Sequence, residues 1–271
     1  MPLDISAANV PGPPGAQKRT HRKAVTLSHT VKMLLGAAAI AAAPTISSAA
    51  SLDFSAGSFD AVNDVLTFSN VAAGTDLVVS TIGGTSWASN NDARNGTANG
   101  DDGRINVATG TMADLRFSFI NRDTGGAATL ADIDLAFFDL DFAGQEKLTL
   151  RTAASTITRV DTALGVSTEP GSVTLTGASD VNVANVTDSS SLTEDQEKAA
   201  VIFSFDSVSS FDLSFDAGGA LGSGRNFIFD DDFAFTTDTT TIDFPAPVPL
   251  PAAGFLLIGG LGALAVARRR S

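Results

Sequence analysis

The stretch FSFDSVSSFDLSF, residues 203–215, indicates the fold of this chain. Apolar and polar residues alternate at both of its ends, in Phe203-Ser-Phe205 and in Phe211-Asp-Leu-Ser-Phe215, with a Ser-rich segment between them. Because the side chains of a β-strand point to opposite faces in turn, this period of two puts the large apolar groups on one face and Ser and Asp on the other. The pattern predicts two amphipathic strands.

The same alternation recurs along the body of the chain, without a competing helical period. Turn signals separate the alternating segments, for example Gly125-Gly126, Glu169-Pro-Gly171 and Gly218-Gly219. About a dozen short strands of this kind predict an all-β protein, an antiparallel β-sandwich with a jelly-roll-like chain path and a core made mainly of Phe. The strands are expected at residues 62–68, 77–82, 115–119, 133–135, 137–142, 147–151, 155–160, 172–176, 181–186, 203–205, 211–215 and 226–235.

The distribution of charge argues against a nucleic-acid partner. The chain has 271 residues and a formal net charge of −13, but eight of its 17 basic residues lie within residues 1–50 and 268–271. Of its 30 acidic residues, 29 lie between these two ends, so residues 51–267 carry a net charge of −20. A body with this charge repels phosphate backbones.

The missing residue types exclude most kinds of catalysis. The chain has no Cys, and its two His residues, His21 and His29, both lie in the first 50 residues. The body therefore lacks the side chains for a Ser-His-Asp triad, a Cys nucleophile, or an imidazole or thiolate zinc site. No glycine-rich phosphate loop or dinucleotide motif is present. We therefore expect a protein that is not an enzyme, and the one enzymatic alternative is a glycoside hydrolase that uses two carboxylates.

The first 50 residues have the pattern of an export signal. The basic segment QKRTHRK, residues 17–23, precedes an apolar run of eleven residues at 33–43, and the small residues SSAAS follow at 47–51. This run is too short to span a bilayer and has the length of the apolar region of a signal peptide. We expect a leader over residues 1–50 that is cleaved after Ala49 or Ala50, and a β-sandwich domain over residues 51–235.

The other end of the chain has the pattern of a tethered membrane anchor. Residues 236–247 are rich in Thr and Pro and are predicted to form an extended linker. Residues 252–267 are sixteen uncharged residues, and Pro249-Leu-Pro251 extends the uncharged stretch to nineteen, near the short limit of a transmembrane helix. The basic cluster of Arg268, Arg269 and Arg270 should stay on the cytoplasmic side. The sequence predicts a single C-terminal transmembrane helix within residues 248–271.

These C-terminal parts resemble the PEP-CTERM family of protein-sorting domains. The signature Val248-Pro249-Leu250-Pro251-Ala252 is similar to that of the VPLPA variant, and the apolar segment and the Arg cluster follow it in the same order. The resemblance covers residues 248–271 and implies an exosortase-like membrane protease or transpeptidase as partner, which cuts at the Pro signature and passes the body to the cell surface. A plain membrane anchor is the alternative, and neither indicates what the body does.

Two Phe-rich segments contain clustered carboxylates. In FFDLDF, residues 137–142, Asp139 and Asp141 share one face of the predicted strand, and Glu146 follows directly. In FIFDDDFAF, residues 227–235, Asp230 and Asp232 share one face.

Asp231, by the same alternation, falls on the face of the phenylalanines. A lone carboxylate there would cost several kcal/mol unless a partner stabilised it. Three arrangements would meet this need: a β-bulge that turns Asp231 outward, an ion pair with Arg225 or another Arg, or a bound Ca²⁺. The six acids of both segments are therefore candidate ligands of a structural calcium ion, and solvated acidic faces are the simpler interpretation.

The segment 83–104 is predicted to be a long polar loop, and it contains Trp87, the only Trp of a chain without Tyr. Two interpretations of the body follow from these observations. The first is an exported bacterial cell-surface or extracellular-matrix protein with a structural or adhesive role. The second is a carbohydrate-binding module that uses Trp87, with Ca²⁺ as structural ion and exopolysaccharide as ligand.

Overall fold

The computed structural model describes residues 51–83, 87–141, 145–161, 163–177, 189–219 and 224–246. The leader with Ala49 and Ala50, the sorting signature at 248–252 and the Arg cluster at 268–270 lie outside these ranges, as does the strand expected at 181–186. In the ranges given, no helix is long and apolar enough to cross a membrane.

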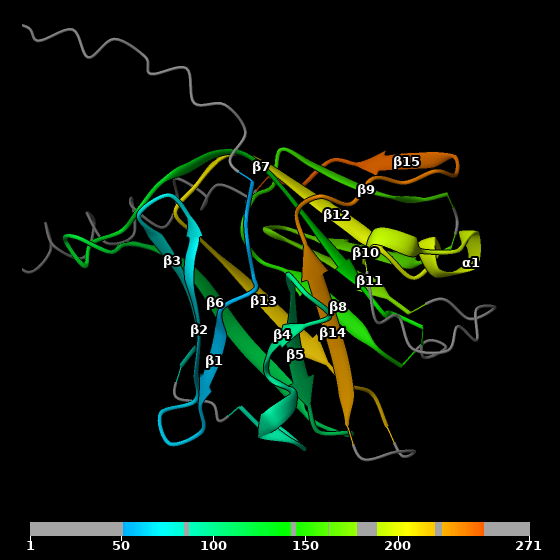
Figure 1. Ribbon diagram of the computed structural model, residues 1–271. Coiled ribbons are helices and arrows are strands. Elements are labelled where there is room, and N and C mark those ends of the chain that lie inside the picture. Colours follow the sequence, from blue (N-terminus) through cyan, green and yellow to red (C-terminus); the bar gives the residue numbers. More distant parts are fainter. Residues whose placement is uncertain are drawn as a thin grey trace, which may run out of the picture. The chain divides into compact units, whose positions relative to one another are not determined.

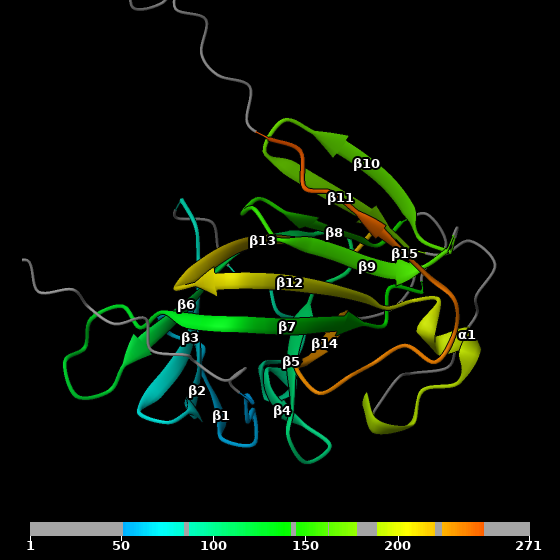
Figure 2. The same ribbon diagram turned by 90° about the horizontal axis from the view of Figure 1, so that it is seen from above.

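Two antiparallel sheets packed on a shared core make up the fold (Figures 1 and 2). The strands of the eight-stranded sheet are, in spatial order, β1 (Gly57–Asp60), β2 (Val65–Ala72), β3 (Thr75–Thr81), β6 (Met112–Asn121), β13 (Ser210–Asp216), β8 (Lys147–Leu150), β11 (Ser172–Thr176) and β10 (Gly165–Glu169). Those of the seven-stranded sheet are β15 (Thr239–Ile242), β9 (Thr156–Val160), β12 (Val201–Val208), β7 (Leu130–Phe138), β14 (Arg225–Asp230), β5 (Asp102–Val107) and β4 (Gly96–Ala98). The helical elements are η1 (Asp92–Arg94), η2 (Ser189–Ser191) and α1 (Glu194–Glu197). An all-β antiparallel sandwich is therefore confirmed.

The stretch 203–215 crosses from one sheet to the other. Phe203 and Phe205 lie on β12 of the seven-stranded sheet, whereas Phe211 and Phe215 lie on β13 of the eight-stranded sheet. The chain passes between the sheets in the Ser-rich segment, so the apolar faces of both strands point into the same core. The rings of Phe205 and Phe211 stack across it with their centroids 5.2 Å apart.

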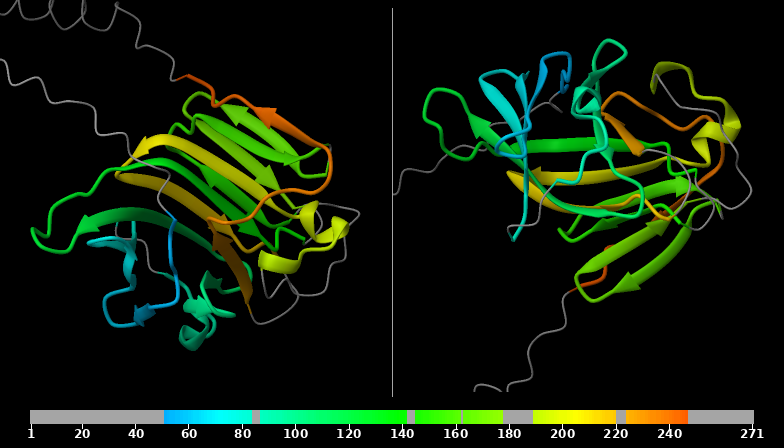
Figure 3. Two further views of the ribbon diagram at one scale, coloured as in Figure 1. Left: turned by 45° about the horizontal axis from the view of Figure 1, so that its top comes forward. Right: turned by 90° about the horizontal axis from the view of Figure 1, so that it is seen from below.

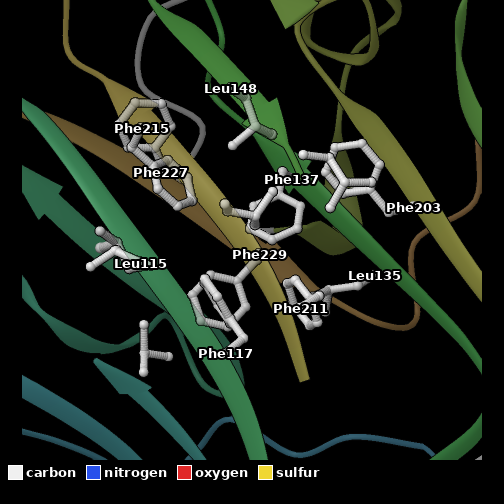
Figure 4. Packing of buried hydrophobic residues seen from close by; sticks show 14 of the residues in the cluster. Leu115, Phe117, Leu135, Phe137, Leu148, Phe203, Phe211, Phe215, Phe227 and Phe229 are labelled. Carbon is white, nitrogen blue, oxygen red and sulfur yellow. The ribbon is translucent and has the colours of Figure 1, made fainter. Parts of the chain in front are cut away.

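Phenylalanine supplies most of the largest fully buried side chains of this core (Figure 4). It accounts for 11 of the 35 buried residues of the core cluster, as many as Leu, so the expectation of a core made mainly of Phe is met only in part. Phe117 of β6 stacks on Phe211 at 4.7 Å and meets the edge of Phe229 of β14 at 5.7 Å. The Phe229 ring also requires the glycine at position 103 of β5, because a Cβ atom there would lie 2.2 Å from it.

Several segments differ from the expected strands, and β1 and β10 lie where no strand was expected. β7 ends at Phe138, because Asp139 adopts a φ of +72°, and β14 ends at Asp230. The segment 83–104, expected to be a loop, contains η1, β4 and the start of β5. Residues 236–247, expected to be a linker, contain β15, which pairs with β9, while Ile242 and Phe244 pack against the core. The linker prediction is therefore wrong for residues 239–244.

A second, smaller apolar cluster covers the outer face of the seven-stranded sheet. Phe138 and Ile228 point outward from β7 and β14 and pack with Ala136 and Ala200. Leu192, Ile202, Phe233 and Phe235 pack against them. Phe233 and Phe235 therefore do not continue the core row of β14, because the chain leaves the strand at Asp231 and folds back over the outer face of the sheet.

Candidate functional site

A pocket of about 360 Å³ lies between the η2–α1 segment and residues 232–236. One wall consists of Ser189, Ser190, Ser191, Leu192 and Glu197, and the other of Asp232, Phe233, Ala234 and Thr236. Hydroxyl and carboxylate groups therefore surround an opening with one aromatic ring. Behind the pocket lie acidic side chains that the sheet and the η2–α1 segment bury together.

Glu197 holds one wall of the pocket in place. Its carboxylate accepts hydrogen bonds from the backbone N–H and the hydroxyl of Thr236, at 3.1 and 2.5 Å, and from those of Thr237, at 3.0 and 2.6 Å. The side chain is buried, and burial alone would raise the pKa of Glu197, but the hydrogen bonds from both threonines lower it overall. Glu197 is therefore a structural anion that fastens the chain leading into β15.

Asp102 and Asp230 are also deeply buried next to the pocket, 1% and 2% exposed. The register that pairs Phe229 with Gly103 brings them together at the ends of β14 and β5. The Ser189 hydroxyl oxygen lies 2.7 Å from a carboxyl oxygen of each. A hydroxyl donates only one proton, so the second contact requires a proton on a carboxyl group.

The pKa of Asp230 agrees with such a proton. Burial raises the pKa of Asp230 to about 8, and the neighbouring side chain of Asp232 contributes in the same direction. Asp230 is therefore protonated at neutral pH and can share hydrogen bonds with Ser189 without a cation.

Asp231 takes an arrangement different from the three that the sequence suggested. It is half-buried beyond the end of β14, where its carboxylate accepts a hydrogen bond from the backbone N–H of Leu52. Burial raises the pKa of Asp231 to about 6, and this hydrogen bond opposes the effect. The carboxylate leaves the aromatic row because the strand ends there.

The acids of the first Phe-rich segment surround an ion pair. Glu146 is 1% exposed and accepts a hydrogen bond from the backbone N–H of Asp141 at 3.1 Å. The other carboxylate oxygen of Glu146 lies 3.2 Å from Nε of Arg225. Burial raises the pKa of Asp141, and the charge of Arg225 opposes this. Asp139 lies directly after β7 and does not share a strand face with Asp141.

The six candidate calcium ligands do not form a single site. Glu146 contacts Arg225 at the first residue of β14, whereas Asp230 is its last residue. The rise along a strand separates these positions by about 16 Å. Nowhere in the described ranges do three acidic side chains form a group that could hold a metal ion.

Trp87 does not offer a surface for a sugar. Its side chain is 4% exposed, its indole N–H donates to the carbonyl of Asn106 at 3.1 Å, and its ring meets the edge of Phe59 at 4.9 Å. The side-chain oxygen of Asn106 accepts from the N–H groups of Asn90 and Asn91, which ties this segment to β5. The Trp87 prediction is wrong because the indole belongs to the core.

Sequence reasoning missed Ser189, Glu197 and Asp102. A local signal was present for the first two, since Thr193 and Gln196 have the spacing of a capping box, which the structure contains at the start of α1. Nothing local marks Asp102, because the residues that bury it lie 87 and more positions along the chain.

The sequence matches no protein-family model and no curated protein. Among solved structures, the chain is similar to the N-terminal domain of the Streptococcus gordonii adhesin Sgo0707, with a TM-score of 0.41 and 10% sequence identity. The match covers 64% of this chain and 49% of that one, so it spans about half the length of that structure.

Proposed function

We propose that this chain is an exported bacterial cell-surface or extracellular-matrix protein whose β-sandwich has a structural or adhesive role and no catalytic one. The observation that carries this proposal is the order of parts at the C-terminus, where the Pro signature at 248–252, an apolar segment and the Arg cluster at 268–270 follow a β-sandwich. An exosortase-like enzyme would be its sorting partner, and the C-terminal helix would hold the chain in the membrane until processing.

The state of the buried acids supports a non-catalytic role. Hydrolysis of a glycoside needs two carboxyl groups that both reach the substrate. Asp102 and Asp230 are almost fully buried and share the hydroxyl of Ser189, while Glu197 is hydrogen-bonded to Thr236 and Thr237. These carboxyl groups are therefore used in contacts within the fold and do not face a bound substrate.

Mass spectrometry of the chain recovered from the cell surface tests the sorting proposal. We expect a mature form that ends at the Pro signature and lacks Arg268, Arg269 and Arg270. The double variant P249A/P251A should stay unprocessed in the membrane, while the control P245A, upstream of the signature, should be processed like the wild type. A surface form that still carries all three arginines would identify the segment as a plain anchor.

The alternation of strands between the sheets supports a jelly-roll-like path. β6, β8, β11 and β13 lie in the eight-stranded sheet, and β7, β9, β12 and β14 lie in the seven-stranded sheet. The chain therefore crosses the core repeatedly, as it does in a jelly roll. Between β6 and β14, the alternation is broken by β10, which forms a hairpin with β11 in the same sheet. Outside this range, β1 to β3, β4 with β5, and β14 with β15 are consecutive strands of one sheet.

The pocket favours a second candidate function, carbohydrate binding. Its hydroxyl groups, the exposed Asp232 and the ring of Phe233 are the kinds of group that bind a sugar, whereas the buried Trp87 is not accessible. The double variant D232N/F233A should lose retention on a polysaccharide array, and the control V62A, at an exposed position far along the chain, should keep it. Equal retention of both variants would contradict sugar binding at this pocket.

A further inference from the structure

β10 is the most exposed of the described strands. All five of its residues, Gly165 to Glu169, are exposed, and its register with β11 is continuous. Among the strands that the structure describes, β10 is the last of its sheet, so one side of its backbone has no neighbouring strand. An edge of this kind is a template for another strand.

The opposite side of the sandwich is closed. There, β1 and β4, the end strands of the two sheets, lie against each other. The N–H of Gly57 donates to the hydroxyl of Thr97 at 2.9 Å, and a Cβ atom on Gly57 would lie 2.7 Å from the Thr97 nitrogen. This close approach leaves no room for a further strand between them.

β10 and β15 are the end strands of the two sheets at the other side (Figures 2 and 3). The backbone after β15 reaches the end of the β10–β11 hairpin, where Gly171 N–H donates to the carbonyl of Pro245 at 3.4 Å. This contact involves the turn and leaves the open backbone of β10 exposed.

The sequence of β10 has few of the devices that protect an edge strand. GVSTE contains no Lys, no Pro and no bulge, and its one charge, Glu169, is at the end. Val166 is one of the few large apolar side chains that are exposed, at 38%. It pairs with Leu175 of β11, a core residue, so it belongs to the core-facing row, and no described strand lies on its outer side.

We propose that β10 pairs antiparallel with β10 of a second copy of this chain, which joins the two eight-stranded sheets into one. A twofold axis at Ser167 places Val166 opposite Thr168 of the second copy, and Glu169 opposite Gly165 of the second copy. The single charge of the strand therefore faces a glycine. Parallel pairing would instead place Glu169 beside its own copy, which is unfavourable for like charges.

The acidic body sets the conditions for this pairing. Residues 51–267 carry a net charge of −20, so two copies repel each other until salt screens them. Association should therefore strengthen with ionic strength. The proposal goes beyond the proposed function and does not depend on sorting, because β10 is the same strand before and after any processing at residues 248–252.

Cross-linking of the full chain tests the pairing. Because the chain has no Cys, an introduced thiol is the only group that a thiol cross-linker can react with. In the variant S167C, the two introduced thiols would face each other with Cβ atoms about 5 Å apart, within reach of a short thiol cross-linker. The control S58C places a thiol at an exposed position of β1, the opposite edge strand of the same sheet. We expect at least fivefold more covalent dimer from S167C than from S58C, and more at higher NaCl concentration.

Charge pairs in the S167C background test the register. V166K/T168K places like charges opposite each other and should abolish the cross-link, whereas V166K/T168E places opposite charges there and should keep it. Circular dichroism would check that both variants keep the wild-type fold, as expected for exposed positions. Equal cross-linking of S167C and S58C, or of the two charge variants, would overturn the proposal. Neither result depends on sorting or on sugar binding.

Discussion

Glu197 illustrates how one side chain can decide the position of a whole segment. Its carboxylate satisfies four donor groups on Thr236 and Thr237, which are the residues that lead from the second apolar cluster into β15. In E197Q, the amide would be a weaker acceptor and would direct its NH₂ group at one of these donors. We expect a loss of about 1–3 kcal/mol in the free energy of unfolding, measured with denaturant.

The matched control is E194Q, on the same turn of helix but exposed. It should unfold like the wild type. The effect of Glu197 also has a pH dependence: because the pKa of Glu197 is lowered in the folded state, its contribution is present at neutral pH and is lost as the pH falls through that lowered value. A loss in E194Q equal to that in E197Q would show that the contacts with Thr236 and Thr237 are not its cause.

Asp230 should give the opposite pH dependence. Its pKa is raised to about 8, so between the unfolded value of 3.8 and 8 the folded state holds a proton that the unfolded state has released. Stability therefore falls as the pH rises across this window, by up to about 1.4 kcal/mol per pH unit. D230N imitates the protonated acid and should flatten the decline in unfolding free energy between about pH 5 and 8. The exposed control D238N should keep the slope of the wild type, and a D230N slope equal to it would contradict this assignment.

At the scale of the element, β5 and β14 show how one strand restricts the residues of its neighbour. Gly103 lies opposite Phe229 in the register of these strands, and a methyl group at position 103 would overlap the ring. G103A should therefore destabilise the fold by about 1–3 kcal/mol, because the ring has to move within a packed core. The control G126A lies at an exposed turn where the nearest atom would be 3.5 Å away, so its melting temperature should be unchanged.

The same strands show which elements a sequence can reveal. β6, β12 and β13 were predicted because Phe and Leu alternate with polar residues over several positions. β5 begins in a Gly- and Asp-rich segment that has no local strand pattern. Its glycine, Gly103, is required by Phe229, which lies 126 positions along the chain, so the local sequence does not predict this strand. The sequence of β15, a run of Thr and Ile, is compatible with both a strand and an extended linker. Only its pairing with β9 in the folded chain identifies it as a strand.

The candidate site was partly predictable for a similar reason. The sequence correctly indicated that Asp231 needs a partner, but it did not indicate the burial of Asp230. The partners themselves, the hydroxyl of Ser189 and the N–H of Leu52, lie 41 and 179 residues away and come together only in the folded chain. The sequence therefore indicated that a carboxyl group here needs a partner, but it could not identify the groups that the fold brings next to it.

At the scale of the whole molecule, the acidic charge should limit stability. Residues 51–267 have 29 acids against nine bases, so most acids have no cation available and repel one another. Raising NaCl from about 0.01 to 0.15 M shortens the screening length from about 30 to 8 Å. The melting temperature of the full chain should then rise by a few degrees, which corresponds to about 1 kcal/mol for a domain of this size.

A comparison of CaCl₂ with NaCl distinguishes charge screening from binding of calcium at a specific site. Because no group of three acids in the described ranges could hold a metal ion, CaCl₂ should raise the melting temperature no more than NaCl at equal ionic strength, and EDTA should leave it unchanged. A bound structural ion would instead stabilise the fold in proportion to the logarithm of its concentration, well above the effect of ionic strength. An increase of that kind, reversed by EDTA, would contradict the screening account and support the calcium ligands that the sequence suggested. D139N and D231N, measured separately, would then show which end of β14 holds the ion.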